Sequence, residues 1–533
     1  MTNSQKQAII TLLEKKGKDR TRIQNWRPIS LLNMDYKIAT KVIAYRIKNV
    51  LPSIIHHSQT GYVKNRYIGE SIRIIEDLMN YTKVQDIPGI LLFVDFRKAF
   101  DSIEWPYLMK CLHHFNFGKD LCKWVKTFYD KSSSCIINNG FTSGYFNLHR
   151  GVRQGDPLSP YLFILGMELL SVAIRHDDTI DGIDVLGRTV KLAQYADDMN
   201  TFVSSEASAK RFFIVLEQFS RISGLEVNRE KTQGMWLGNL RHSKKEILGI
   251  AWPTDPIKGL GVYFSYDHDQ REQQNFKGKL KELEDILNIW KCRNLSLTGK
   301  TLIIKTLGIS KFTNLALIST VPDWVSKDIK RLIFNFLWGG NADKVKRDIV
   351  YQNYDLGGLR MLNVDMYFQA LRASWIPRYF SDIDADWKVF FNMSLKQENI
   401  NIFLFSNYDE KDKTLNSGNF YTNAIVTWKL ARNEFEKNIP KQNQCVWYNK
   451  EITVNKQPIF YKAFANCGLW HIIDMFDKNR KFLRFSSLCD RGLKQTDYLR
   501  WHSLVAMVAQ YRNTFDSNID VLNQNVCSEN RIK

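Results

Sequence analysis

The clearest hydrophobic pattern in the chain is a continuous apolar run at residues 91–96, Leu-Leu-Phe-Val-Asp-Phe, which contains one acidic residue. A short uninterrupted apolar run is typical of a strand that is buried on both faces. Because an isolated carboxylate is costly to bury, we expect this strand to end by exposing Asp95. The run therefore predicts a buried strand with an acid at its end.

Further elements are predicted on both sides of this strand. A short strand is predicted over residues 8–13, and a hairpin over residues 192–203 with the turn Tyr195-Ala196-Asp197-Asp198 at its tip. Helices are predicted over residues 38–51 (ending at Pro52), after the capping pair Asp156-Pro157, and over residues 209–222. This alternation predicts an α+β fold in which helices back an antiparallel sheet.

The pattern changes after residue 267. An amphipathic helix with interspersed lysines is predicted from Phe276 to Trp290, and a second helical segment around residues 302–307. We therefore expect four segments, with a mostly helical C-terminal region and a polar linker over residues 407–418: 1–267, 268–340, 341–406 and 419–533.

Composition and net charge narrow the range of possible functions. Hydrophobic residues make up 44% of the 533 residues, which excludes a wholly disordered or fibrous chain. The 75 basic residues outnumber the 55 acidic ones, for a net charge of +20. A surplus of this size favours a polyanionic partner, and nucleic acid is the expected one. The simpler alternative is a basic surface with no such partner.

The cysteines and the N-terminus indicate the compartment. The eight cysteines lie far apart and form none of the close pairs typical of zinc sites, so we expect buried thiols in a reducing environment. The N-terminus lacks the layout of a signal peptide, and no apolar run is long enough to span a bilayer. These features predict an intracellular protein with no membrane partner.

Three acids carry the candidate chemistry. Asp95 ends the buried strand, and Asp197 and Asp198 lie at the hairpin tip about a hundred residues later. Clustered carboxylates become favourable when a divalent metal lies between them, and their hard oxygens suit Mg²⁺. Two such ions can activate a 3′-hydroxyl and stabilise a leaving pyrophosphate. The structural alternative is ordinary: Asp-Asp pairs are common in turns, and an Asp at a strand end is often a cap.

Residues near the acids suggest a nucleotide pocket. A loop rich in glycine and proline spans residues 150–160, and glycine lets the backbone approach a ligand closely. Phe100 lies five residues after Asp95, where a bulky ring can occupy the volume of a ribose 2′-hydroxyl. Taken alone, Phe100 is better explained by packing in the core.

Several longer motifs follow one another in order along the chain. They are Asn25 to Leu32, Gln59 to Arg66, Phe93 to Asp101, Arg153 to Pro160, Tyr195 to Asp198, Gly224 to Asn228 with Lys231-Thr232, and Leu260 to Val262. In this order they resemble the finger, palm and primer-grip motifs of reverse transcriptases of LINE-type (non-LTR), jockey-like retrotransposons. The resemblance covers roughly residues 7–375. It implies a right-hand polymerase with fingers and palm, then a helical thumb.

The resemblance implies a role for each matching residue. Asp95 and Asp197 would bind two Mg²⁺ ions with the support of Asp198, and Mn²⁺ could substitute for Mg²⁺. Lys231 would lie near the pyrophosphate as a proton donor, and Asp101 would be structural. Nucleotide contacts are implied for Arg27 and Arg66 on the triphosphate, Phe100 as the sugar gate, Gln154 and Gly155 in the pocket, and Phe96 beside them.

The family further implies an RNA template, a DNA primer or target, deoxynucleoside triphosphates, and a location in nucleus and cytoplasm. The upstream endonuclease and the Cys/His knuckle of such elements are expected to lie outside this polypeptide. Two alternatives stay open. One is an inactive retroelement remnant that only binds nucleic acid, and the other is an RNA polymerase built on the same palm, against which Phe100 argues.

Overall fold

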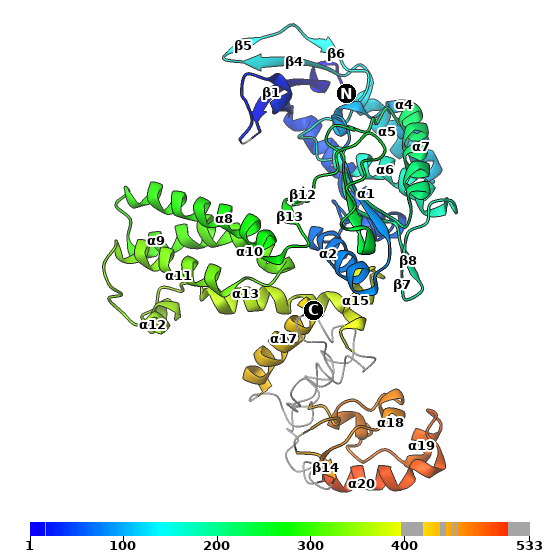
Figure 1. Ribbon diagram of the computed structural model, residues 1–533, viewed down its shortest axis with the longest axis vertical. Coiled ribbons are helices and arrows are strands. Elements are labelled where there is room, and N and C mark those ends of the chain that lie inside the picture. The colour runs from blue at the N-terminus through cyan, green and yellow to red at the C-terminus, as the bar shows by residue number, and fades with distance from the viewer. Residues whose placement is uncertain are drawn as a thin grey trace. The chain divides into compact units, whose positions relative to one another are not determined.

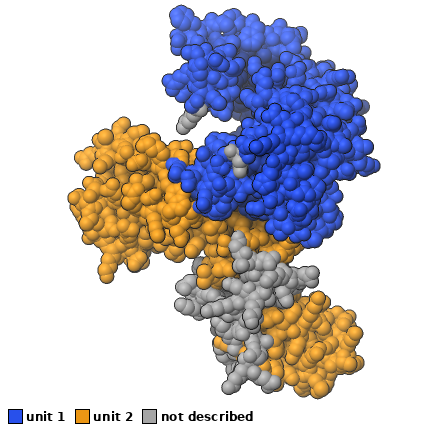
Figure 2. Space-filling model, viewed as in Figure 1, with its two compact units in different colours: residues 1–277, 383–387 blue, residues 278–382, 388–533 orange. Residues whose placement is uncertain are grey.

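The computed structural model describes residues 1–15, 17–254, 256–395, 419–436, 444–449, 451–454 and 457–509. The chain forms two compact units, coloured separately in Figure 2. Unit 1 comprises residues 1–277 and 383–387, and unit 2 comprises residues 278–382 and 388–533. The finer division at residues 267, 340 and 406 stays a prediction.

The central strand of unit 1 is β3 (Gly89–Val94), in which every residue is buried. It pairs on one side with β11 (Gln233–Leu237) and on the other with β10 (Asp198–Val203), and β10 pairs with β9 (Leu192–Tyr195). All of these pairings are antiparallel. The predicted strand and hairpin are confirmed, and β3 ends one residue before Asp95. Figure 1 shows the ribbon of the chain with its main helices and strands labelled.

Helices pack with this sheet in one hydrophobic core. They are α3 (Ala99–Ser102), α4 (Trp105–His114), α5 (Lys119–Tyr129), α6 (Ser159–His176) and α7 (Glu206–Ser223). Helix α2 (Ile68–Gln85) contributes no residue to this core and contacts β9 and β11. Ser205 caps α7 by accepting a hydrogen bond from the backbone N–H of Ser208, and Gly224 ends it at φ +76°. The α+β class and the helices predicted after Asp156-Pro157 and over residues 209–222 are confirmed.

A second sheet is built from the first strands of the chain. Its order is β2-β1-β4-β5, with β6 also paired to β4. The strands are β1 (Gln7–Glu14), β2 (Trp26–Leu32), β4 (Ser133–Asn138), β5 (Phe141–Thr142) and β6 (Phe146–Asn147). The strand predicted over residues 8–13 is therefore confirmed. Two short hairpins complete unit 1: β7 (Ile183–Val185) with β8 (Arg188–Val190), and β12 (Ile257–Gly259) with β13 (Val262–Phe264).

Helix α1 (Met34–Ile54) buries Ile43, Ile47 and Leu51, as the helical periodicity predicts. The expectation that it ends at Pro52 is wrong by two residues, since the helix continues to Ile54. Proline removes one backbone donor and crowds the carbonyl four residues earlier. In the last turn of a helix this loss is small, because few hydrogen bonds remain to be made there.

The amphipathic helix predicted from Phe276 to Trp290 is present, but it begins earlier, at His268, and crosses the boundary between units 1 and 2 at residue 277. This is α8 (His268–Lys291), and it is followed by α9 (Leu297–Ile303), α10 (Ser310–Ile318), α11 (Asp323–Trp338), α12 (Arg347–Tyr351), α13 (Val364–Ala373), α14 (Trp375–Tyr379) and α15 (Trp387–Met393). The short helix expected near residues 302–307 is part of a longer helical run, in which the π-helical segment Ile304–Ile309 joins α9 to α10.

The run Leu297–Ile318 bears on the membrane prediction. By length and composition it is apolar enough to cross a membrane, although the sequence led us to expect no such segment. Half of its apolar window is buried inside the structure. Core helices of soluble proteins pass the same test, so this is weak evidence for a membrane span.

The C-terminal part of the chain contains α17 (Phe420–Glu436) and a segment with its own core. The elements of that segment are β14 (Thr453–Val454), β15 (Gln457–Pro458), α18 (Lys462–Asn466), α19 (Phe485–Cys489) and α20 (Tyr498–Val508). The predicted linker over residues 407–418 lies outside the described residues. The expectation of buried thiols is wrong for Cys292, which is exposed directly after α8, and Cys467 and Cys489 are only partly buried.

Candidate active site

The three candidate acids meet at one end of the β3–β10 pair. Met199 lies opposite Val94 in the ladder, so Asp198 and Asp95 occupy the next positions in register. Asp198 also pairs with Tyr195 across the β9–β10 turn. Ala196 adopts a φ of +56° in this turn, which brings Asp197 to the same end of the sheet. Acids about a hundred residues apart in sequence are thus placed together by strand pairing.

The charges of these acids act on one another. Surrounding protein, and then the charges of Asp197 and Asp95, raise the pKa of Asp198 to about 6. Surrounding protein and the charge of Asp95 also raise the pKa of Asp197. Asp198 itself remains accessible to solvent, so this effect comes from protein packed around the turn and not from full enclosure. The cluster is therefore one in which like charges repel.

Residues of the next motif hold Asp95 in place. The Asn228 side chain donates a hydrogen bond of 3.0 Å from Nδ2 to Oδ2 of Asp95, and its backbone N–H donates one of 2.7 Å to the Asp95 carbonyl. The backbone N–H of Asp95 donates to Oγ1 of Thr232 at 3.3 Å. The sequence placed Asn228 and Thr232 in a motif but assigned them no role.

The donor chemistry of the cluster fits a divalent cation. Carboxylate oxygens are the ligands that Mg²⁺ prefers, and a cation would relieve the repulsion that raises the two pKa values. Across the part of the chain that the structure describes, however, no three His, Cys, Asp or Glu side chains are gathered closely enough to hold a metal ion. Asp95, Asp197 and Asp198 would have to turn toward one another to bind one.

The side-chain amide of Gln59 holds the backbone of the turn at Ala196. Oε1 of Gln59 accepts hydrogen bonds from the backbone N–H groups of Ala196 (2.8 Å) and Gly61 (2.9 Å), and its Nε2 donates to the Ala196 carbonyl at 3.2 Å. A Cβ on Gly61 would lie 2.5 Å from the Ala196 nitrogen, so only glycine allows this approach. The sequence did not identify this role of Gln59, which depends on a partner 137 residues away.

Arg66 contacts backbone carbonyls in this structure, and its contact with the triphosphate stays a prediction. Its guanidinium donates hydrogen bonds to the backbone carbonyls of Pro52, Ile55, His56 and Gln59. These carbonyls lie at and just after the C-terminal end of α1, where helix carbonyls lack partners within the helix, and the half-buried Arg66 side chain satisfies them. Arg66 therefore supports the loop that carries Gln59.

Other cations do surround the acids. Burial lowers the pKa of Lys15, the charges of Lys231 and Arg27 lower it further, and the charge of Asp95 opposes them. Arg27 pairs with Leu13 near the end of β1. Strand β1 ends at Glu14, and Lys15 follows it directly. The structure thus groups the predicted Arg27 and Lys231 with Lys15, which the sequence analysis missed because a lone lysine after a strand carries no motif.

Gln154 and Gly155, which are predicted to line the nucleotide pocket, contact Asp101 and Ser30. Nε2 of Gln154 donates to Oδ1 of Asp101 at 3.4 Å, and the Gln154 carbonyl accepts from the backbone N–H of Ser30 at 2.8 Å. Gly155 is exposed at φ +109°, and a Cβ there would lie 2.8 Å from the Ser30 carbonyl oxygen. Gln154 and Gly155 therefore join the loop to β2 (Trp26–Leu32).

The two phenylalanines near Asp95 differ in their surroundings. Phe100 is half-buried and stacks on Phe163 with ring centroids 4.5 Å apart. Phe96 is 6% exposed and bridges to Val227. The alternation of side chains after β3 directs the Phe96 ring into the core, and its expected substrate contact stays a prediction.

Comparison with known proteins decides the family. Residues 13–264 match the family described as "Reverse transcriptase (RNA-dependent DNA polymerase)". This part of the chain is a reverse transcriptase domain. The right-hand polymerase fold that the motifs predicted is confirmed, and the reverse transcriptase domain contains every candidate site residue discussed above.

Similar proteins come from non-LTR retrotransposons. The chain is 31% identical over 393 residues to the 149 kDa protein of transposon TX1 from Xenopus laevis, which covers 72% of this chain and 29% of that protein. It is 24% identical to the RNA-directed DNA polymerase of the mobile element jockey from Drosophila melanogaster, over 44% of this chain and 26% of that protein. The LINE-type resemblance is therefore confirmed. The chain spans less than a third of the length of either relative.

Solved structures resemble the chain more loosely. Apo telomerase from Candida tropicalis is 12% identical with a TM-score of 0.42, over 73% of this chain and 70% of that one. The RNA-dependent RNA polymerase of a human picorbirnavirus is 13% identical with a TM-score of 0.37, over 68% and 61%. These likenesses are too distant to inform the site of the reverse transcriptase domain.

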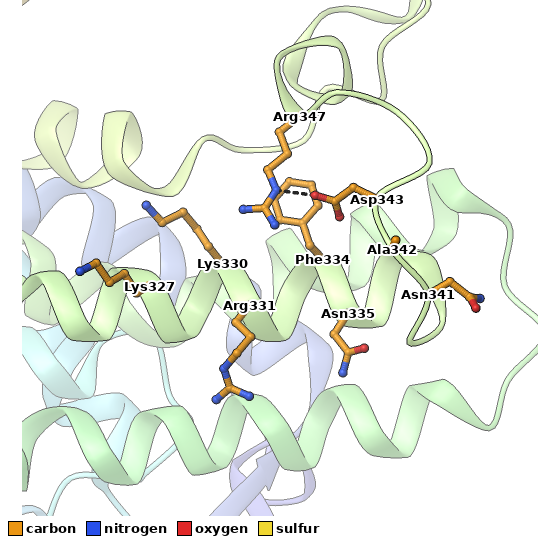
Figure 3. A pocket seen from close by; sticks show the side chains of 9 residues that line it. All are labelled: Lys327, Lys330, Arg331, Phe334, Asn335, Asn341, Ala342, Asp343 and Arg347. Carbon is orange, nitrogen blue, oxygen red and sulfur yellow. Dashed lines mark hydrogen bonds and ion pairs between the residues drawn. The ribbon is translucent and has the colours of Figure 1, made fainter.

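Unit 2 contains a basic pocket outside the reverse transcriptase domain. It measures about 610 Å³ and lies between α11 (Asp323–Trp338) and the loop before α12 (Figure 3). It is lined by Lys327, Lys330, Arg331, Phe334, Asn335, Asn341, Ala342, Asp343 and Arg347. The guanidinium of Arg347 lies 4.2 Å from the centre of the Phe334 ring and pairs with Asp343 at 2.8 Å. Two other cations of the lining are also paired, Lys330 with Asp365 at 2.7 Å and Arg331 with Asp328 at 3.2 Å.

Proposed function

We propose that this protein is an RNA-directed DNA polymerase of a non-LTR retrotransposon, which adds deoxynucleotides to a primer 3′-hydroxyl on an RNA template. The observation that supports this best is the meeting of Asp95, Asp197 and Asp198 at one end of the β3–β10 pair, with their charges acting on one another. An inert scaffold gains nothing from such repulsion, whereas a nucleotidyl transferase needs closely placed carboxylates to hold cations.

Asp95 and Asp197 would hold two Mg²⁺ ions, with Asp198 beside them, and Mn²⁺ is a substitute. When bound there, the ions would neutralise the charge of the pyrophosphate and lower the pKa of the primer hydroxyl. Asn228 orients Asp95 through its 3.0 Å hydrogen bond. Gln59 holds the backbone of the turn that presents Asp197.

The cationic residues beside the acids would bind the incoming triphosphate. Lys15 interacts electrostatically with Arg27, with Lys231 and with Asp95. A lysine is a compact donor of both charge and proton, which suits Lys231 for protonating the pyrophosphate. Phe100 would exclude the 2′-hydroxyl, with its ring steadied by the stack on Phe163.

The rest of the chain supports a nucleic-acid partner. The net charge of +20 and the basic pocket on α11 both favour contacts with a phosphate backbone, which would come from an RNA template and a DNA primer or target. We further propose an intracellular location, in nucleus and cytoplasm, in keeping with copying by a retrotransposon.

Extension of a DNA primer annealed to poly(rA) tests the function. With Mg²⁺ and dTTP we expect primers longer than the starting oligonucleotide, and no extension when Mg²⁺ is removed with a chelator. Salt-dependent RNA binding without any incorporation would instead favour a remnant that only binds nucleic acid.

A further inference from the structure

A short segment remote in sequence belongs to the catalytic unit. Residues 383–387 fold with unit 1. Within this segment Asp386 is 6% exposed. Its Oδ1 lies 3.0 Å from Nε2 of His57 and 2.6 Å from Nε of Arg188. Nη2 of Arg188 also lies 3.1 Å from the same His57 nitrogen, so the three side chains form one cluster.

The Asp386 carboxylate is ionised in this cluster. Burial opposes its charge, but the hydrogen bond and charge of His57, together with Arg188, hold its pKa below the ordinary value. Asp386 therefore provides a fixed negative charge between two elements of unit 1. Asp384 binds the same arginine at 2.7 Å, but its side chain is 81% exposed.

Each partner of Asp386 lies close in sequence to a residue that holds the turn at residues 195–198, which we call the catalytic turn. His57 lies two residues before Gln59, whose amide holds both the N–H and the carbonyl of Ala196. Arg188 lies in β8 (Arg188–Val190), and β9 (Leu192–Tyr195) follows it and ends at the turn. The cluster therefore joins the two segments that determine where Asp197 and Asp198 lie.

These two segments are also paired along their backbones. The N–H of Gln194 donates to the Ser58 carbonyl, and the N–H of Thr60 donates to the Gln194 carbonyl, both at 2.8 Å. Gln59 and Gln194 form a parallel bridge. Movement of the 56–61 loop would consequently shift β9 and the turn at its end.

We propose that Asp386 is a positioning residue for the catalytic turn, acting through His57 and Arg188 on the Gln59–Ala196 contact. This inference rests on the proposed polymerase function. A displacement of about 1 Å in a two-metal site lowers the rate without removing any catalytic group. The effect of Asp386 should therefore fall on kcat, and template binding should be spared.

The test compares Asp386→Ala with the matched control Asp384→Ala in the full chain. We expect Asp386→Ala to lower kcat for dTTP on poly(rA) about tenfold or more while the Kd for template-primer changes less than about twofold. Asp384→Ala should leave kcat within about twofold, because an exposed pair contributes little. Asp386→Asn keeps an acceptor oxygen and the side-chain volume, and should recover part of the loss.

A double-mutant cycle tests the route. If Asp386 acts through Gln59, the variant carrying both Asp386→Ala and Gln59→Leu should lose no more of kcat than the worse single variant. Additive losses would overturn this route. Amide hydrogen exchange of residues 192–199 gives a readout that needs no activity: Asp386→Ala should speed exchange there and leave α7 (Glu206–Ser223) unchanged.

The outcomes separate the two proposals. If the wild-type protein polymerises, and Asp386→Ala and Asp386→Asn both match it in kcat and in exchange of residues 192–199, the positioning role is wrong and the polymerase function stands. If the wild-type protein incorporates no nucleotide, the polymerase function fails, and unchanged exchange in both Asp386 variants would overturn the positioning role as well. If Asp386→Ala does not fold, the milder Asp386→Asn decides the question in the same two measurements.

Discussion

Asn228 donates a hydrogen bond of 3.0 Å from its side-chain amide to Oδ2 of Asp95, and its backbone N–H bonds to the Asp95 carbonyl at 2.7 Å. One residue of the segment before β11 (Gln233–Leu237) thus fixes both the side chain and the backbone of the acid that ends β3. The carboxylate oxygen that accepts from Asn228 is oriented by it, which leaves the other oxygen for an ion.

Replacing Asn228 should impair catalysis more than binding. A hydrogen bond to a charged group contributes about 1.5–3 kcal/mol, so Asn228→Ala should lower kcat roughly 10- to 100-fold with little change in template affinity. Single-turnover primer extension and a filter-binding assay measure the two quantities. Asn228→Ser, which retains a short donor, is the control, and a variant Asn228→Ala with full activity would contradict the role.

The acid cluster should lower stability when no divalent ion is present. A carboxyl whose pKa rises on folding holds its proton more tightly in the folded state, so its ionisation lowers stability as the pH climbs from 3.8 through about 6. Asp198→Asn should therefore raise Tm by about 2 °C or more at pH 7.5 in a chelator, and the gain should vanish near pH 4. Thermal denaturation at both pH values measures this. A lower Tm at pH 7.5 would indicate that Asp198 is a stabilising acid.

Replacement of Arg27 and replacement of Arg66 should have different effects, although the motifs predict a triphosphate contact for both residues. Arg27 is exposed beside Lys15, so Arg27→Ala should raise KM for dTTP about tenfold and leave Tm nearly unchanged. Arg66→Ala removes the donors of backbone carbonyls and should lower Tm markedly. Steady-state kinetics and thermal denaturation of both variants decide this. A raised KM with normal Tm for Arg66→Ala would support its predicted phosphate contact.

The residues that the sequence predicted well are those whose signal is local. The sequence identifies Asp95 and Asp197 because an acid in or beside an apolar run destabilises the fold, which indicates that it has a function. Gln59, Lys15 and Asp386 were missed because their roles depend on partners far along the chain, as with His57 and Asp386, which are 329 residues apart. The motif alone does not determine the contacts of Arg66, because a motif gives the residue type, while the direction of a guanidinium depends on which carbonyls lie near it.

Phe100 should control the choice of sugar. Its ring is half-buried and stacked on Phe163 at 4.5 Å, so Phe100→Ala should open space and raise incorporation of ribonucleotides relative to deoxynucleotides at least about tenfold. The ratio of kcat/KM for UTP and dTTP measures this. Phe163→Leu removes the stack and should have a smaller effect in the same direction. A wild-type enzyme that already prefers UTP would point to an RNA polymerase.

The most direct measurement of the whole account is primer extension on poly(rA) by Asp197→Asn beside the wild-type protein, with Mg²⁺ and dTTP. Asparagine keeps the size of the side chain and removes the charge that binds a cation, so we expect incorporation to fall about a thousandfold or more while template-primer binding is retained. Extension by Asp197→Asn at the wild-type rate would show that these acids do not carry the chemistry, and it would contradict the polymerase assignment of the site.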